Sequence, residues 1–337
     1  MKSVLWKSGL LLLLLLAAML LVACGGDDEV FFTDGDYTYS LVSKGEYEIF
    51  SYEGNEKNVI VPTKVKGARV VSIGERAFAG NETIETVSVG DGIEEIGREA
   101  FLDCTSLEKV LISDTVLTIG NYAFSGCMLL SDIQIPQKIS KLGEGTFKRC
   151  ISLAKIELPD TLAYIGDYVF EGCVSLTAFT LPDHTATLGS AFIGCVSLVH
   201  VSLNKELREI KAETFSSCHS LQSVSGGANV TTIGRGAFRA CRSLTEFTMP
   251  QKLRIINDEA FLGCSSLVSV MFYETVDASG KKMAALVRQS AFDDCGALKT
   301  VYYHYSGEEE KSLLTIEENG NALLLGANMI FVRKDDK

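Results

Sequence analysis

The apolar positions of this chain follow a pattern that changes within each short segment. Around residue 104, one apolar set is spaced by 4, 4 and 3 positions, and the next by 3 and 2. The first spacing is typical of a helix and the second of a strand. We therefore predict a short helix or helical turn, then a short strand, with the chain returning to the next coil. The residues are Ile96, Ala100, Cys104 and Leu107 in the first set, Val110 and Ile112 in the second, and Val116 and Ile119 in the return.

The same unit recurs along most of the chain. A cysteine stands at positions 104, 127, 150, 173, 195, 218, 241, 264 and 295, so the interval is 23 residues except for one of 22 and one of 31. A phenylalanine lies three residues before each cysteine, and Phe78 extends the series with Asn81 in the cysteine position. Ten units result. Because a unit of this length cannot bury its own apolar face, neighbouring units must stack.

The stacked units predict an α/β repeat solenoid, a right-handed superhelix. We expect one parallel sheet of short strands on one side and the helices or helical turns on the other. Glycine after an aliphatic residue marks one bend, as at Gly97 and Gly120, where a missing Cβ permits positive φ or close stacking of coils. Proline, as at Pro136 and Pro159, ends the strand at the other corner because it donates no ladder hydrogen bond.

The unit resembles the BspA-like leucine-rich repeats of bacterial surface proteins over about residues 37 to 303. The shared motif is Ile-Gly-x-x-Ala-Phe-x-x-Cys-x-Ser-Leu-x-x-Val-x-Leu-Pro, and one copy runs almost whole from Ile165 through Phe170, Cys173 and Leu176 to Pro182. The resemblance implies a leucine-rich-repeat fold. It also implies adhesion, because similar proteins are associated with binding of extracellular matrix proteins and with bacterial coaggregation.

The two ends differ from the repeats. Residues 1–23 have two lysines and a Leu/Ala run, as in a secretory signal. The sequence Leu21-Val22-Ala23-Cys24 resembles a bacterial lipobox, which implies lipidation at Cys24 and an exported outer-membrane lipoprotein, displayed on the cell surface. We expect a flexible acidic tether over 24–36, an N-terminal β cap over 37–62, repeats over 63–303 with an insertion at about 275–282, and a C-terminal cap over 304–337.

Charge excludes one class of partner. The chain carries a formal charge of −12, and removal of residues 1–23 takes away two lysines, giving 29 − 43 = −14. Nucleic-acid binding needs a basic stripe that neutralises phosphates, and this sequence has none. We expect no nucleic-acid partner. The oligomeric state is left open.

The cysteine column allows three interpretations. Disulfides are common in exported proteins, and equivalent positions in stacked strands are close enough to pair. Identical side chains in register, however, point the same way, and Asn81 fits a slot for a small, weakly hydrogen-bonding side chain that faces neighbouring backbone. We favour reduced core thiols over disulfides, and both over a metal site, because no Cys-x-x-Cys spacing occurs. No cofactor is predicted.

Catalysis is not indicated by the sequence. The four histidines, His184, His200, His219 and His304, stand in no recognisable motif, and no phosphate-binding glycine loop follows a strand. We predict that the protein is not an enzyme.

Binding by the exposed sheet face is the remaining hypothesis. Residues five and seven positions after each cysteine should point outward. Many are Ser or Thr, as expected for ordinary solvated strands, but aromatics and Met cluster near the last coil. The candidate surface comprises Met271, Tyr273, Tyr302, Tyr303, Tyr305, Lys109, Gln134, Lys155, Glu157 and His200. Adhesion to host or other cell-surface proteins is the first hypothesis, and glycan capture by stacking on Tyr302 and Tyr303 is the alternative.

Overall fold

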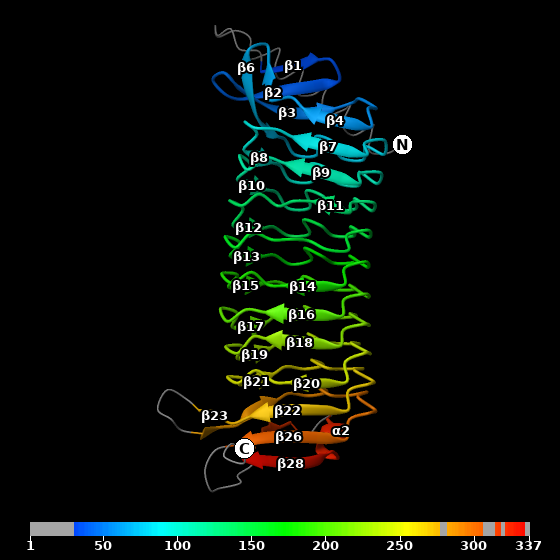
Figure 1. Cartoon of the computed structure of the whole chain (residues 1–337), viewed down its shortest axis with the longest axis vertical. Coiled ribbons are helices and arrows are strands. Elements are labelled where there is room, and N and C mark those ends of the chain that lie inside the picture. The colour runs from blue at the N-terminus through cyan, green and yellow to red at the C-terminus, as the bar shows by residue number, and fades with distance from the viewer. Residues whose placement is uncertain (1–29, 277–281, 306–313, 318–320, 334–337) are drawn as a thin grey trace.

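The chain folds into a straight stack of coils, as Figure 1 shows for the computed structural model. The structure describes residues 30–276, 282–305, 314–317 and 321–333. The predicted signal segment and Cys24 lie outside these residues. Each coil except that of Cys150 contributes one strand to a parallel arrangement that we call the long ladder. Its strands are β4 (Asn58–Val61), β7 (Thr86–Val89), β9 (Lys109–Ile112), β11 (Asp132–Ile133), β14 (Ala178–Thr180), β16 (His200–Leu203), β18 (Ser223–Gly226), β20 (Glu246–Thr248), β22 (Ser269–Tyr273), β26 (Thr300–Tyr305) and β28 (Asn328–Arg333).

A second parallel arrangement, the short ladder, forms where the chain returns to the next coil. The repeat solenoid was predicted correctly, but the expectation of a single sheet omitted this ladder. Most of its strands have only two residues and one buried side chain, such as Ile96, so no alternation reveals them in the sequence. They are β6 (Ala68–Ile73), β8 (Glu95–Ile96), β10 (Thr118–Ile119), β12 (Lys141–Leu142), β13 (Tyr164–Ile165), β15 (Thr187–Leu188), β17 (Glu209–Ile210), β19 (Thr232–Ile233), β21 (Ile255–Ile256), β25 (Ala285–Val287) and β27 (Leu314–Ile316).

The segment that carries the phenylalanine and the cysteine is a series of turns. Each turn closes with a hydrogen bond to the residue three positions earlier, as from the Cys104 amide to the Phe101 carbonyl at 3.2 Å. Two residues in the turns of every repeat except the 22-residue one have left-handed backbone, for example Glu99 with φ 54° and Asp103 with φ 56°. These residues prevent a continuous helix. Of the two predicted forms, a short helix or a helical turn, the repeats therefore contain helical turns.

The phenylalanines and cysteines form two continuous columns in the core. Neighbouring rings are stacked with centroids 4.8 to 6.0 Å apart. Each buried ring stabilises the fold by about 1.5–3 kcal/mol relative to an exposed one. Each Sγ donates a hydrogen bond of 3.0 to 3.2 Å to a phenylalanine carbonyl of the preceding coil. In the first repeat, the Asn81 amide donates to the Gly54 carbonyl at 3.1 Å instead. The column therefore has the role predicted for a small side chain that bonds neighbouring backbone.

The glycines after the short-ladder strands allow coils to approach closely. A Cβ at Gly120 would lie 2.5 Å from the Arg98 backbone nitrogen and 2.6 Å from the Gly97 carbonyl carbon. The sequence allowed either positive φ or close stacking of coils as the reason for these glycines, and at Gly120 the reason is close stacking.

An antiparallel meander closes the N-terminal end. It consists of β1 (Phe31–Asp34), β2 (Tyr37–Ser43) and β3 (Glu46–Tyr52), and β3 pairs in parallel with β6. The short strand β5 (Lys64–Val65) forms an antiparallel hairpin with β6. The predicted tether over 24–36 was too long, because Phe31–Asp34 pairs with β2 and the Phe32 ring stacks on Tyr39.

The C-terminal cap is an irregular eleventh coil. It has β27 in the short ladder, the helix α2 (Ala322–Leu325) in place of the turns, and β28 in the long ladder. The predicted insertion leaves the coil as a hairpin of β23 (Thr275–Val276) and β24 (Lys282–Met283), visible beside β22 in Figure 1. Within the described part of the chain, no helix is long and apolar enough to cross a membrane.

Candidate binding surface

The long ladder presents one flat outer face. Its strands alternate between buried and solvent-facing residues, as in β16, where Val201 and Leu203 are buried and His200 and Ser202 face outward. Because all strands are parallel and in register, outward residues of successive coils form straight columns along the molecule. The prediction that residues five and seven positions after each cysteine point outward is therefore correct for this strand.

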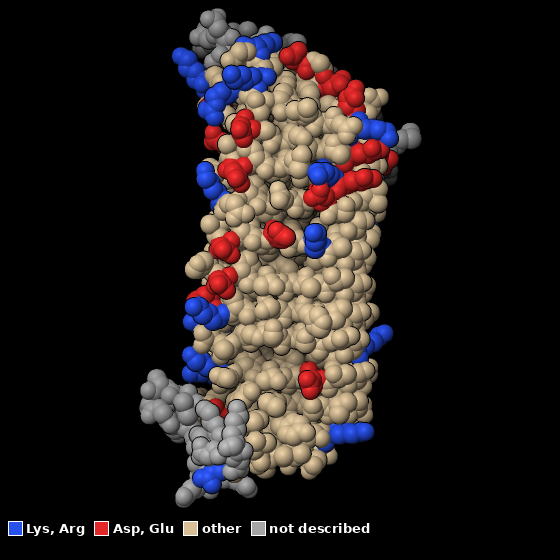
Figure 2. Space-filling model, viewed as in Figure 1, with Lys and Arg blue, Asp and Glu red and all other residues tan. Residues whose placement is uncertain are grey.

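Charge divides this face into two parts. Figure 2 shows most charged side chains of this face over the N-terminal coils, and the C-terminal coils are largely uncharged apart from a carboxylate such as that of Glu246 in β20. In the charged part, the Lys109 ammonium lies 2.6 Å from the Asp132 carboxylate in the next strand. Such exposed ion pairs contribute at most about 1 kcal/mol. Lys155 and Glu157 are also exposed here.

The middle of the face carries short hydroxyl side chains. Thr180, Ser202, Ser225 and Thr248 follow one another in a single column, and His200 bonds Ser223 through Nδ1 at 2.8 Å. The His200 pair lies on an open, flat surface. Among the described residues it has no carboxylate hydrogen-bond partner, so it lacks the orienting acid of a nucleophilic site.

An apolar and aromatic cluster occupies the C-terminal end of the face. Strand register places Met271 beside Tyr302 and Tyr302 beside Ile330. In the neighbouring column, Tyr273 lies beside His304, with ring centroids 5.4 Å apart. The Tyr273 hydroxyl donates to the Met271 sulfur at 3.5 Å. We call these five residues the aromatic patch. They are partly or fully solvent-exposed, and Ile330 has 36% of its surface exposed.

Two of the predicted surface tyrosines point inward. Tyr303 is 2% exposed, and its burial raises the pKa of its phenol. Tyr305 packs partly against the core and lies edge-on to Phe331. Tyr303 and Tyr305 stand two and four positions after the buried Val301, so they face the same side of β26. The sequence alone did not reveal this, because residues 301–305 have no alternation of apolar and polar side chains. They are removed from the candidate surface.

Two residues of the patch were missed by the sequence analysis. His304 was considered only as a catalytic candidate, and Ile330 was assigned to the C-terminal cap without a place in the ladder. The run Asn328–Arg333 has β-type apolar residues, which could have predicted a further strand of the ladder.

The thiols cannot supply reactive groups in the folded chain. Burial raises the pKa of Cys173 and of Cys218 to about 12, so these thiols stay protonated at neutral pH. Among the described residues, no three His, Cys, Asp or Glu side chains are close enough to hold a metal ion.

Comparison with known proteins gives a family match. Six copies of a region described as the BspA type leucine-rich repeat match residues 71–191 and 189–309. A search of curated proteins found no match. Solved structures with similar chains include a leucine-rich cell surface protein from Faecalibacterium prausnitzii, at 22% identity over 90% of this chain and 99% of that one, with a TM-score of 0.46. A leucine-rich-repeat protein from T. pallidum has 27% identity over 63% of this chain and 90% of its own, with a TM-score of 0.46.

Proposed function

Because the chain belongs to the BspA type leucine-rich-repeat family, we propose that it is a lipid-anchored surface protein that binds other proteins through its aromatic patch. Its partners would be extracellular or host proteins of the matrix type. The proposal has two parts, the attachment of the N-terminal end and the contact made by the C-terminal end.

The attachment is supported by the first thirty residues. Cys24 ends a lipobox-like sequence, and lipidation there would hold the chain at the outer membrane, with the coils displayed on the cell surface. Cys24 precedes Val30, the first described residue, by six positions, and the N-terminal cap follows at once. Ten coils at roughly 4.8 Å each would then hold the aromatic patch roughly 50 Å from the cap.

The aromatic patch is the observation that carries the binding proposal. Met271, Tyr302 and Ile330 form a partly exposed apolar row on paired strands, so binding of a partner there needs no ordering of the backbone. Tyrosine and methionine are enriched at protein interfaces, and a few such residues dominate the binding energy. By contrast, Ile60 is 79% exposed but stands alone at the other end of the same column.

Protein binding is favoured over the alternative, glycan capture by two tyrosine rings. That mechanism needs Tyr302 and Tyr303 on one surface, but Tyr303 is buried in the core. Tyr302 alone would offer one ring, whereas the row of Met, Tyr and Ile suits an apolar protein surface.

A binding assay with matched variants tests the proposal. The processed chain would be immobilised and exposed to a panel of extracellular matrix proteins, with affinity measured by surface plasmon resonance. We expect a double variant, Met271→Ser with Tyr302→Ser, to lose at least tenfold in affinity for any protein bound, about 1.4 kcal/mol. Ile60→Ser, in the same column, should change nothing. Equal losses in both variants, or unaltered binding by the double variant, would contradict the role of the patch.

A further inference from the structure

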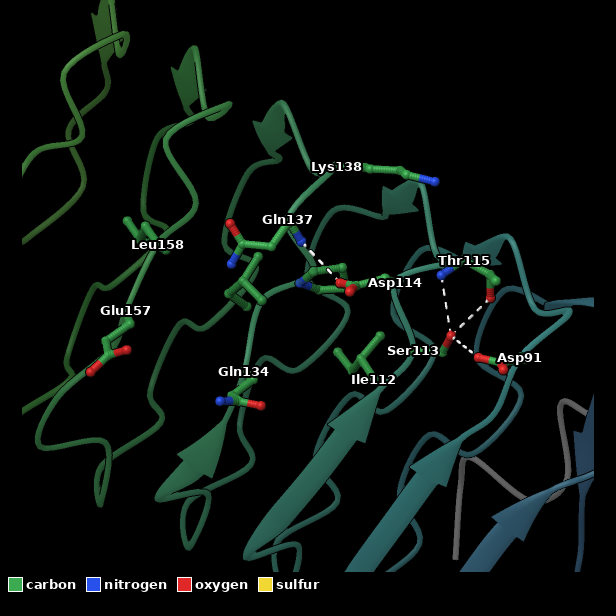
Figure 3. A pocket seen from close by; sticks show the side chains of 12 residues that line it. Asp91, Ile112, Ser113, Asp114, Thr115, Gln134, Gln137, Lys138, Glu157 and Leu158 are labelled. Atoms are coloured by element: carbon green, nitrogen blue, oxygen red, sulfur yellow. Dashed lines mark hydrogen bonds between the residues drawn. The ribbon is translucent and has the colours of Figure 1, made fainter.

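A hollow lies at the corner where the long ladder meets the next bend, on coils remote from the aromatic patch. Its volume is about 710 Å³, within the range of roughly 300–1,000 Å³ for small-ligand sites. Figure 3 shows that four successive coils supply its walls. Its polar side chains are those of Asp91, Ser113, Asp114, Thr115, Gln134, Gln137, Lys138 and Glu157, and its apolar ones are those of Ile112, Ile135, Pro136 and Leu158.

The hollow exists because the long ladder is interrupted at this point. β9 extends to Ile112, but β11 ends at Ile133, and the next coil forms no strand between β11 and β14. Pro136 and Pro159 stand at these two corners and donate no backbone hydrogen bond there. The hollow therefore lies beside the coil that contributes no strand to the long ladder.

One wall is held in place by hydrogen bonds. The Ser113 hydroxyl donates to the Asp91 carboxylate and accepts from the Thr115 amide at 3.2 Å. In the next coil, the backbone N–H of Gln137 donates to the Asp114 carboxylate at 3.2 Å. Both carboxylates thus keep fixed positions while their remaining oxygen lone pairs stay available.

The opposite wall has planar polar groups ready to bind. Gln134 and Glu157 occupy the same outward column in adjacent coils, and both are exposed. Within the described part of the chain, neither side chain has a hydrogen-bond partner. Half-buried Ile112 lies between Gln134 and Ser113, and half-buried Leu158 lies beside Glu157 at the outer edge, so the hollow combines two separate apolar contacts with amide and carboxylate edges.

We propose that this hollow binds a neutral oligosaccharide. Sugar rings present C–H faces to apolar side chains, here Ile112 and Leu158, and pairs of adjacent hydroxyls to planar amides and carboxylates, here led by Gln134 and Glu157. Three carboxylates against the single Lys138 disfavour anionic sugars through like-charge repulsion. The open shape predicts weak, millimolar binding. This site is separate from the aromatic patch, and the proposal does not depend on the protein-binding function.

Saturation-transfer NMR on the processed chain tests the site with maltotriose, cellotriose, mannotriose and chitotriose at millimolar concentration. We expect signal from at least one of them, and a fall of at least fivefold in the double variant Gln134→Ala with Glu157→Ala. Glu246→Ala is the matched control, because Glu246 is an exposed carboxylate on the same face outside the hollow. Circular dichroism checks that every variant remains folded.

Trigalacturonate serves as the anionic probe and should give at most one-fifth of the signal of the best neutral trisaccharide. The proposal is overturned if no neutral trisaccharide gives signal, if the double variant retains it, if the Glu246 variant loses it equally, or if trigalacturonate binds as well. Because Met271→Ser with Tyr302→Ser leaves the hollow intact, that variant should retain sugar binding whether or not protein binding is lost.

Discussion

Several residues other than glycine have left-handed backbone in this fold, because every coil repeats the same turn before its cysteine. The position before each column cysteine has positive φ, and it is glycine in some coils, such as Gly126 and Gly263, but not in others. Ala240 has φ 58° at this position and Ser217 has φ 62°. A left-handed residue other than glycine costs about 1–2 kcal/mol, so these coils are locally strained.

Ala240→Gly should therefore stabilise the protein. We expect a gain of about 0.5–1 kcal/mol, because relief of the left-handed strain exceeds the extra entropy that glycine loses on folding. Urea unfolding followed by circular dichroism measures it. The matched control is Ala228→Gly, at an exposed corner residue without positive φ, which should lower stability. A loss of stability for Ala240→Gly would refute the explanation.

At the scale of elements, the recurrence of Phe and Cys was sufficient to predict the coil number, the long ladder and the outward parity. The short ladder was missed because a strand with one buried residue, such as Ile119, has no alternation. The turns could not be separated from helices because Glu99 and Asp103 adopt positive φ without being glycine. The sequence indicated three members of the aromatic patch, but its remaining two and the corner hollow depend on strand register and ladder length.

Contact between coils at the short ladder should make Gly120 hard to replace. In Gly120→Ala, the new Cβ would meet backbone atoms of the preceding coil, which cannot move without disturbing the ladder. We expect a loss of about 1–3 kcal/mol, measured by urea unfolding. Gly296→Ala is the control, because a Cβ there meets nothing within 4 Å. Similar stabilities for the two variants would show that coil spacing is more adaptable than the structure implies.

Across the whole molecule, the column of buried thiols makes folding depend on pH. Burial raises the pKa of six column thiols, and the value for Cys173 and Cys218 is about 12, against 9.0 for an exposed thiol. A hydrogen bond with Cys295, together with burial, raises the pKa of Cys264. Between pH 9 and pH 12, the unfolded chain therefore loses protons that the folded chain retains. Stability is complete below pH 9 and falls as the pH rises through this window.

The expected fall in stability with pH is steep because the contributions of the individual thiols add. Each fully buried thiol removes about 1.4 kcal/mol per pH unit above pH 9, so several together should unfold the solenoid well before pH 12. Urea midpoints measured from pH 7 to pH 10.5 in the presence of a reductant test this. Replacing both Cys173 and Cys218 with alanine should lower stability at pH 7, because two hydrogen bonds to phenylalanine carbonyls are lost, but it should also make the decline above pH 9 shallower. An unchanged slope in that variant would mean that groups other than the column thiols govern the alkaline transition. Buried Tyr39 and half-buried Tyr122, with pKa values of about 12, would then be the next to replace.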